Sequence, residues 1–249
     1  MSRKVATFRF YEELNDFIPS NQDKGDRSHF FYGSPKVKHV IESFGIPHTE
    51  VDLILVNDNP VSFDYTIKHN DRIAVYPKFE TLDISEVTKL NNSPLRVTKF
   101  ILDVHLGKLA RYLRLLGFDS LYSNDLGDDT IINISEKEHR IILTRDKGIL
   151  KNNKVTHGYY LRSDNPTDQL QEVIKRFYLD KNLKIFSRCM ECNGDIVAIS
   201  KEDIQPELLP GTIQYYNEFF QCKTCRKIYW KGSHYQNMIN FIETILQEQ

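Results

Sequence analysis

Four cysteines in two close pairs constrain the fold of this 249-residue chain more than any other feature. The pairs are Cys-x2-Cys motifs, Cys189/Cys192 and Cys222/Cys225, and 29 residues separate them. Zn²⁺ prefers four tetrahedral thiolates, and each pair brings two sulfurs to the ion from one tight turn. The spacing therefore predicts a structural zinc ribbon over residues 181–249, whose four sulfur ligands leave no position for a reactive water. Disulfides and an iron–sulfur cluster are the alternatives.

Composition excludes several classes of function. The chain is 40% hydrophobic and 27% charged, as is usual for soluble proteins. Its first ten residues lack the apolar core of a secretory signal, and no run approaches the roughly 18 apolar residues of a membrane span. We therefore expect a cytoplasmic protein with no membrane role, in a reducing compartment that favours metal over disulfides. A formal net charge of −1 gives no general attraction to nucleic acid, so any such site must be a local patch.

Residues 1–79 have the element order of a small β-grasp domain. The pattern predicts strand, strand, helix, strand and strand at 3–10, 30–32, 34–45, 51–56 and 71–76. Ser34 is the expected N-cap of the helix, Pro35 its first residue and Gly45 its stop. This order resembles a ubiquitin-like domain close to the sulfur-carrier type, but the chain continues past Tyr76 and has no free Gly-Gly tail there. We expect a docking or regulatory module that binds a protein partner, followed by a linker over 80–96.

From residue 97 the pattern changes to alternating strands and helices. Strands are predicted at 100–103, 119–123, 141–144 and 158–161. Helices are predicted at 104–116, 128–139 and 166–178. This alternation indicates a parallel sheet with right-handed crossovers, covered by helices, over residues 97–180. The whole chain is thus expected to be a multidomain protein of α/β and α+β class.

Carboxylates follow the strands of this predicted sheet. They are Asp103, Asp125, Asp128, Asp129, Asp146 and Asp164. Ligands bind outside the carboxyl ends of the strands in an open parallel sheet, so we expect these side chains to converge on one rim. Clustered carboxylates repel unless a cation neutralises them, and Mg²⁺ or Mn²⁺ bound there can activate water for attack on a phosphodiester. For any single Asp, a helix N-cap or strand end is an equally good explanation.

Several segments of this region carry a family resemblance. They are Phe100-Ile-Leu-Asp103, Leu106–Asp119, Asn124–Asp129, Ile142–Asp146 and Arg162-Ser-Asp164. In them the chain resembles the PIN-like RNase domain of the Mut-seven C-terminal family, which often pairs a ubiquitin-like N-terminal domain with a C-terminal zinc ribbon. The resemblance implies metal-dependent ribonuclease activity.

The resemblance also implies roles for individual acids. The implied catalytic residues are Asp103, Asp128 or Asp129, Asp146 and Asp164, and the implied Mg²⁺ or Mn²⁺ ligands are Asp103, Asp146 and Asp164. One position departs from the pattern, because a typical PIN nuclease has a Glu on a central helix where this chain offers Asp128 and Asp129.

Basic and aromatic residues near these acids and in the ribbon are candidates for RNA contacts. The candidates are Lys108, Arg111, Arg145, Lys227, Trp230 and His234. Cations bind phosphates, and aromatic rings stack on unpaired bases. His234 also resembles the family's tail after the second cysteine pair. A solvated helix face explains Lys108 and Arg114 about equally well, and packing within the ribbon does the same for Tyr229 and Trp230.

Three functions compete on this evidence. The leading hypothesis is a ribonuclease that uses the Asp cluster with Mg²⁺ or Mn²⁺, while the zinc ribbon helps to hold RNA. The second is a noncatalytic RNA-binding or ribosome-associated adaptor in which the acids only cap helices. The third is a phosphatase or phospho-acceptor domain with Asp103 as nucleophile. Such enzymes place a further Asp two residues later, where this chain has His105.

Overall fold

The computed structural model describes residues 2–19, 25–77, 87–90 and 97–247. The predicted linker over 80–96 lies outside the described residues, apart from 87–90. The chain divides into two compact units, which are described separately: residues 1–96 with 128–160, and residues 97–127 with 161–249.

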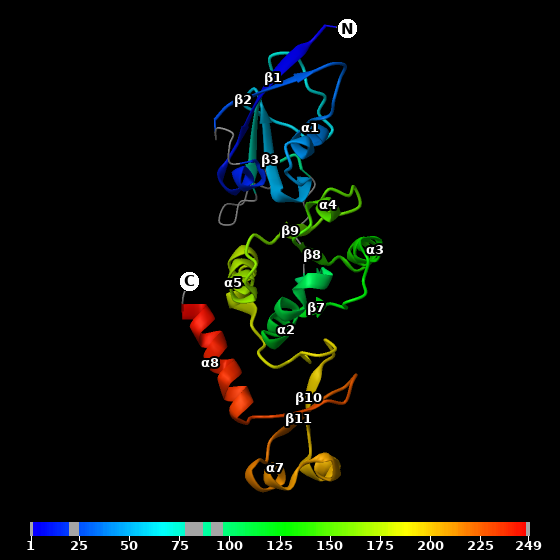
Figure 1. Cartoon of the computed structure of the whole chain (residues 1–249), viewed down its shortest axis with the longest axis vertical. Helices are drawn as coiled ribbons and strands as arrows, with labels where there is room; N and C mark the ends of the chain where they lie inside the picture. The colour runs from blue at the N-terminus through cyan, green and yellow to red at the C-terminus, as the bar shows by residue number, and fades with distance from the viewer. Residues whose placement is uncertain (1, 20–24, 78–86, 91–96, 248–249) are drawn as a thin grey trace. The chain divides into compact units, whose positions relative to one another are not determined.

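The N-terminal sheet confirms the predicted β-grasp order. Its five strands are β1 Lys4–Phe10, β2 Arg27–Phe31, β3 Val51–Val56, β4 Asn59–Pro60 and β5 Arg72–Pro77. The order across the sheet is β2-β1-β5-β3-β4, and the central pair β1–β5 is parallel. Helix α1, Val37–Ser43, packs against one face of this sheet (Figure 1). Phe8, Ile41 and Ile54 are fully buried in the core between them.

Helix α1 begins later than the sequence predicts. Ser34 and Pro35 precede it, and Lys36 stands at the N-cap position without a side-chain cap. The reason is backbone pairing: the N–H of Ile67 donates to the Pro35 carbonyl, and the N–H of Val37 donates to the Tyr65 carbonyl. These bonds hold the backbone before Val37 in an extended conformation, so helical geometry starts only at that residue.

The first unit also contains the segment from 128 to 160. Its elements are α3 Asp128–Glu138, β8 Ile141–Thr144, α4 Lys147–Leu150 and β9 Gly158–Tyr160. Two short 3-10 helices lie between the β-grasp elements: η1 Glu12–Phe17 follows β1, and η2 His48–Glu50 lies between α1 and β3. Glu50 is buried and accepts a hydrogen bond from the Tyr160 N–H (2.8 Å), and His48 Nε2 lies 2.9 Å from the Val155 carbonyl oxygen. These contacts attach η2 directly to the β9 segment.

The second unit begins with a strand, a helix and a strand. They are β6 Lys99–Leu102, α2 Gly107–Leu115 and β7 Asp119–Leu121, with η3 Val104–Leu106 before α2. Helix α5, Pro166–Phe177, and η4, Leu179–Asn182, follow in the chain. Gly117 ends α2 as predicted, with φ +96°, and a Cβ there would lie 2.3 Å from the Lys184 carbonyl oxygen. Strands β6 and β7 of this unit pair in parallel, as β8 and β9 do in the first unit, which confirms the predicted parallel pairing.

The C-terminal part of the second unit is a small antiparallel sheet followed by a helix. Its strands are β10 Ile196–Ile199, β11 Phe219–Cys222 and β12 Ile228–Trp230. Between β10 and β11 lie α6 Lys201–Ile204, η5 Gln205–Glu207 and α7 Pro210–Tyr215. The last element is α8, Ser233–Gln247. Among the described helices, none combines the length and apolar character that crossing a membrane requires.

Candidate functional site

The four cysteines form one cluster, as the sequence predicts. Their sulfur atoms all lie within 4.8 Å of one another, with Sγ–Sγ distances of 3.5 Å for Cys189–Cys225 and 3.4 Å for Cys192–Cys222. Tetrahedral Zn–S bonds of about 2.3 Å require sulfurs roughly 3.8 Å apart, so the cluster fits one such ion. The residues can therefore hold a single metal ion from four sulfurs.

The two cysteine pairs are built as matching turns. In each, a backbone N–H donates to the carbonyl of the cysteine four positions earlier: Asn193 to Cys189 (2.9 Å) and Arg226 to Cys222 (3.0 Å). Asn193 (φ +68°) and Arg226 (φ +61°) occupy the left-handed region, which turns the chain sharply after the second cysteine of each pair. A Cβ at Gly194 would lie 2.9 Å from Cys222 Sγ, so the turn after Asn193 requires glycine.

Hydrogen bonds and burial shift the pKa values of Cys189 and Cys192 in opposite directions. Burial opposes ionisation of Cys189, but hydrogen bonds from the Tyr229 hydroxyl and from backbone N–H groups outweigh it and lower its pKa to about 7. The Tyr229 Oη lies 3.0 Å from Cys189 Sγ, and burial together with this contact raises the pKa of Tyr229. Burial raises the pKa of Cys192 to about 12. A divalent ion favours the thiolate form of its ligands, and metal binding would therefore release protons here.

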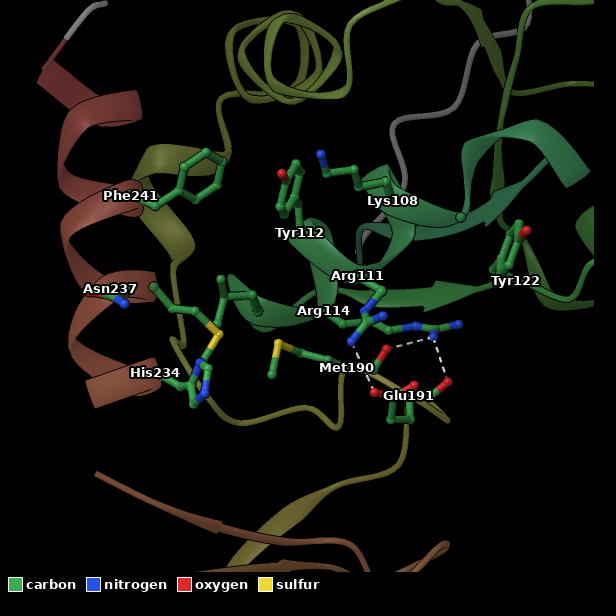
Figure 2. Close-up of a pocket in the computed structure, with 13 residues that line it drawn as sticks. Lys108, Arg111, Tyr112, Arg114, Tyr122, Met190, Glu191, His234, Asn237 and Phe241 are labelled. Atoms are coloured by element: carbon green, nitrogen blue, oxygen red, sulfur yellow. Dashed lines mark hydrogen bonds and ion pairs between the residues drawn. The ribbon is translucent and has the colours of Figure 1, made fainter. Parts of the chain in front are cut away.

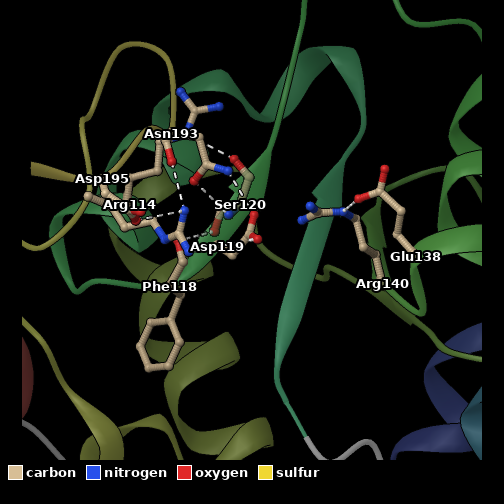
Figure 3. A network of polar contacts seen from close by, with 9 residues as sticks. Arg114, Phe118, Asp119, Ser120, Glu138, Arg140, Asn193 and Asp195 are labelled. Atoms are coloured by element: carbon tan, nitrogen blue, oxygen red, sulfur yellow. Dashed lines mark hydrogen bonds and ion pairs between the residues drawn. The ribbon is translucent and has the colours of Figure 1, made fainter. Parts of the chain in front are cut away.

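The first cysteine pair is anchored to strand β7 through Asn193 (Figure 3). The Ser120 N–H donates to Asn193 Oδ1 (3.0 Å), and Asn193 Nδ2 donates to Asp119 Oδ1 (2.7 Å). Arg188 extends the network, with its Nη1 donating to the Asn193 carbonyl (2.9 Å) and its Nη2 3.9 Å from Asp119 Oδ2. Asn193 thus accepts from the backbone of the edge strand β7 and donates to a side chain of that strand, which holds the turn of the first cysteine pair against the sheet.

Arg114 of helix α2 supplies a second anchor. Its side chain is 3% exposed. Its Nε donates to the Ser120 carbonyl (2.9 Å), and its Nη1 donates to the carbonyls of Met190 (3.0 Å) and Glu191 (2.8 Å). The two carbonyls lie between Cys189 and Cys192, inside the metal-binding turn. The structure therefore rejects the solvated-face explanation for Arg114: the guanidinium joins α2, β7 and the turn.

The predicted acidic residues are placed at the ends of strands or at the starts of helices. In the second unit, Asp103 follows β6, is 8% exposed and accepts the Val104 N–H at its Oδ1 (2.7 Å); Asp164 precedes α5. In the first unit, Asp128 and Asp129 open α3 and are exposed. Asp146 follows β8 and accepts the Gly148 N–H at its Oδ1 (2.6 Å). Asp103 and Asp146 each cap the helix that follows and stand just beyond the carboxyl end of a parallel strand.

The predicted RNA-contacting residues separate into three groups. Lys108, Arg111 and His234 line one pocket of about 760 Å³ in the second unit (Figure 2). Lys227 is linked to this pocket because Glu191 accepts from both Lys227 Nζ (2.8 Å) and Arg111 Nη2 (3.0 Å). These are the residues that the structure brings together.

The other two candidates lie elsewhere. Arg145 is exposed in the turn between β8 and α4 of the first unit. Trp230 ends β12 and is 38% exposed, with its ring 6.3 Å from that of Tyr216. Both residues are exposed, and neither lines the pocket.

The pocket is bounded by α2, the first cysteine pair and α8. Figure 2 shows Tyr112 of α2 facing Phe241 of α8, with Met190 below them. The two ring centroids are 4.7 Å apart and tilted by 35°. Lys108 reaches over the ring of Tyr112, with Nζ 5.9 Å from its centroid. The arrangement combines an apolar interior with cations at its border, which suits an aromatic anion.

Sequence reasoning missed helix α8 and the part it plays in the pocket. A signal for it was present, because Tyr235, Met238, Ile242 and Ile245 recur at helical spacing. Ile242 and Ile245 are buried, as that spacing indicates. Glu191 was missed for a different reason: it lies between two cysteines, and only the folded turn brings it beside Arg111 of α2 and Lys227, the residue before β12.

Comparison with known proteins gives two matches to family models. The model described as Mut7-C RNAse domain matches residues 98–242, and the model described as Mut7-C ubiquitin matches residues 3–83. No curated protein and no solved structure matches the chain at a significant level. The first model covers more than half of the chain and includes both the strand-end carboxylates and the four cysteines.

Proposed function

The chain belongs to the Mut7-C RNAse domain family, and from this we propose that it is a metal-dependent ribonuclease that hydrolyses RNA phosphodiester bonds. The observation that carries the proposal is the family match over residues 98–242. The match includes Asp103 and Asp146, which stand just beyond the carboxyl ends of β6 and β8. Ligands of open parallel sheets bind at those ends.

Mg²⁺ or Mn²⁺ is the metal that this donor set fits, because both ions prefer carboxylate oxygens. We assign Asp103, Asp146 and Asp164 as its ligands, with Asp128 or Asp129 as a further catalytic acid. Such an ion stabilises negative charge on the phosphate and lowers the pKa of a bound water. The backbone orients these ligands. The Val104 N–H donates to Asp103 Oδ1 and the Gly148 N–H donates to Asp146 Oδ1, so each carboxylate is held in one orientation.

The cysteine cluster is proposed to hold Zn²⁺ in a purely structural role. Four sulfur ligands complete its tetrahedral shell, so this ion has no position for a substrate or a water. The ribbon instead supports the RNA-binding surface, for which we propose Lys227, Trp230 and His234 together with Lys108, Arg111 and Arg145. We further propose that residues 97–180 form the nuclease domain, 181–249 the ribbon and 1–79 a module that binds a protein partner.

The test compares Mn²⁺-dependent cleavage of mixed RNA by the natural chain and by a variant with Asp103→Asn and Asp146→Asn. Asparagine caps helices about as well as aspartate, so the variant keeps its local structure but loses two negative ligands. We expect a rate at least about 100-fold lower. Asp203→Asn, at an exposed position in α6, is the matched control and should cleave at the natural rate.

A noncatalytic RNA-binding adaptor is the second candidate, and one observation favours it. Asp103 and Asp146 both cap helices, which is by itself a sufficient structural role. Equal cleavage by the natural chain and the double variant would contradict the ribonuclease, and retained RNA binding in the same samples would support the adaptor.

A further inference from the structure

We propose that the pocket between α2, the first cysteine pair and α8 holds one unpaired base of the RNA strand, with the adjoining phosphate at Lys108 and Arg111. This inference rests on the proposed ribonuclease function and narrows its substrate to RNA with an unpaired segment. The pocket's residues all belong to the second compact unit.

The interior of the pocket has the chemistry of a base-binding site. Tyr112, Met190, Met238 and Phe241 form its apolar walls. Its volume of about 760 Å³ falls within the roughly 300–1,000 Å³ of sites that bury a small organic ligand. The rings of Tyr112 and Phe241 are already in contact at 4.7 Å, so a base lies against this pair and the methionines and does not insert between the rings.

The border of the pocket selects an anion. Lys108 and Arg111 are exposed at one edge, whereas Glu191 is the single carboxylate among the lining residues. Glu191 pairs with Arg111 and also with Lys227 outside the pocket, so two cations share one negative charge. Together with Lys108, the charged side chains at this border have a net positive charge, although the formal net charge of the chain is −1. The phosphate next to the buried base is attracted to these cations.

Helix α8 supplies polar groups opposite these cations. His234 and Asn237 are exposed and line the pocket from the helix (Figure 2). Their ring nitrogens and amide can donate to and accept from the edge of a base. The pocket therefore has apolar walls, cations on one side and hydrogen-bonding groups on the other. These features match a nucleotide whose base is unpaired, because a base in a duplex exposes neither its face nor its full edge.

The experiment fills the pocket without disturbing the core. Asn237→Trp places a large ring in the pocket from an exposed helical position, and Gln236→Trp places the same ring one residue earlier, outside it. Binding of the full chain to a labelled single-stranded RNA is measured by fluorescence anisotropy without added Mg²⁺ or Mn²⁺. We expect Asn237→Trp to weaken binding about tenfold or more and Gln236→Trp to change it less than twofold. Equal affinities of the two variants overturn the proposal.

Duplex RNA of the same sequence separates base binding from charge alone. The natural chain should bind the duplex more weakly than the single strand, and Asn237→Trp should not weaken duplex binding further. A duplex that binds as tightly, with the same sensitivity to Asn237→Trp, overturns the proposal. The experiment measures binding and not cleavage, so it tests the base-binding proposal separately from the ribonuclease proposal. Base binding can be confirmed even if the Asp103 and Asp146 variant cleaves RNA normally, and it can be contradicted even if the natural chain is a ribonuclease. Equal zinc content and circular dichroism confirm that both Trp variants are folded.

Discussion

Arg114 shows at the residue scale that a cation on an amphipathic helix need not face solvent. Its neighbours on α2, Lys108 and Arg111, are exposed, yet Arg114 is buried and donates to three carbonyls. Burial lowers its pKa, and the nearby Cys189 and Cys192 sulfurs oppose that shift. A guanidinium in this position holds its charge because its Nε and Nη1 donate to three carbonyl oxygens.

Replacement of Arg114 by Met should destabilise the second unit. The change leaves the Ser120, Met190 and Glu191 carbonyls without their donor, at a cost of about 2–4 kcal/mol in the free energy of unfolding. Urea denaturation of the zinc-loaded protein measures this change. Lys108→Met on the exposed side of the same helix is the control and should shift stability by no more than about 0.5 kcal/mol. Equal unfolding midpoints for the two variants would contradict the anchoring role of Arg114.

The ribbon is the element whose folding we expect to depend most on a metal. Strands β10, β11 and β12 contain few fully buried residues beyond Phe219 and Cys222, and the sulfurs of the two cysteine turns meet in one cluster. A small sheet of this kind has too little apolar core to fold stably by itself. A metal ion held by the four cysteines would therefore contribute directly to its folding.

Zinc removal should unfold the ribbon, and the chain carries its own reporter for the change. Trp230 is the single tryptophan and lies in β12. We expect one zinc per chain and a shift of Trp230 fluorescence to longer wavelength when a chelator removes it. Cys225→Ser should lose zinc and show the shifted spectrum, whereas Lys223→Ser, an exposed neighbour in the same turn, should keep both zinc and spectrum. An unshifted spectrum in zinc-free protein would rule out a structural role.

At the scale of the whole molecule, packing does not follow the order of the chain. The segment 128–160 belongs to the same compact unit as the β-grasp sheet. Two contacts link this segment to the β-grasp residues. The Tyr160 N–H donates to the Glu50 carboxylate, and Lys147 Nζ lies 4.8 Å from the ring centroid of Phe17. Lys147 follows Asp146 directly. The ubiquitin-like module thus supports the segment that carries a proposed catalytic acid.

Loss of the Glu50 carboxylate should loosen that segment. Glu50→Ala leaves the Tyr160 N–H without its acceptor and should lower the free energy of unfolding by about 1–3 kcal/mol. Hydrogen exchange should rise across residues 147–160. Glu12→Ala, at an exposed site in η1, is the control and should leave exchange in this segment unchanged. Unchanged exchange in Glu50→Ala would show that the module does not support the segment.

The sequence by itself determined the features that depend on short spacing. The turn of each cysteine pair is formed by a backbone hydrogen bond between residues four positions apart, so the cysteine cluster can be predicted from the sequence. The parallel sheet follows from alternating apolar runs, and the β-grasp order follows from five local patterns. These are set by the backbone and by side-chain periodicity, and they require no knowledge of distant partners.

Tertiary structure alone decided how these elements are joined. The contacts of Arg114 with the metal-binding turn span 76 and 77 residues, and Glu50 meets Tyr160 across 110 residues. Tyr112 meets Phe241 only because α8 returns beside α2. No local pattern encodes such pairings, because each depends on which surfaces remain to be buried after the elements form. For the same reason, the sequence did not show that the turn of the first cysteine pair also forms one wall of a pocket with α2 and α8.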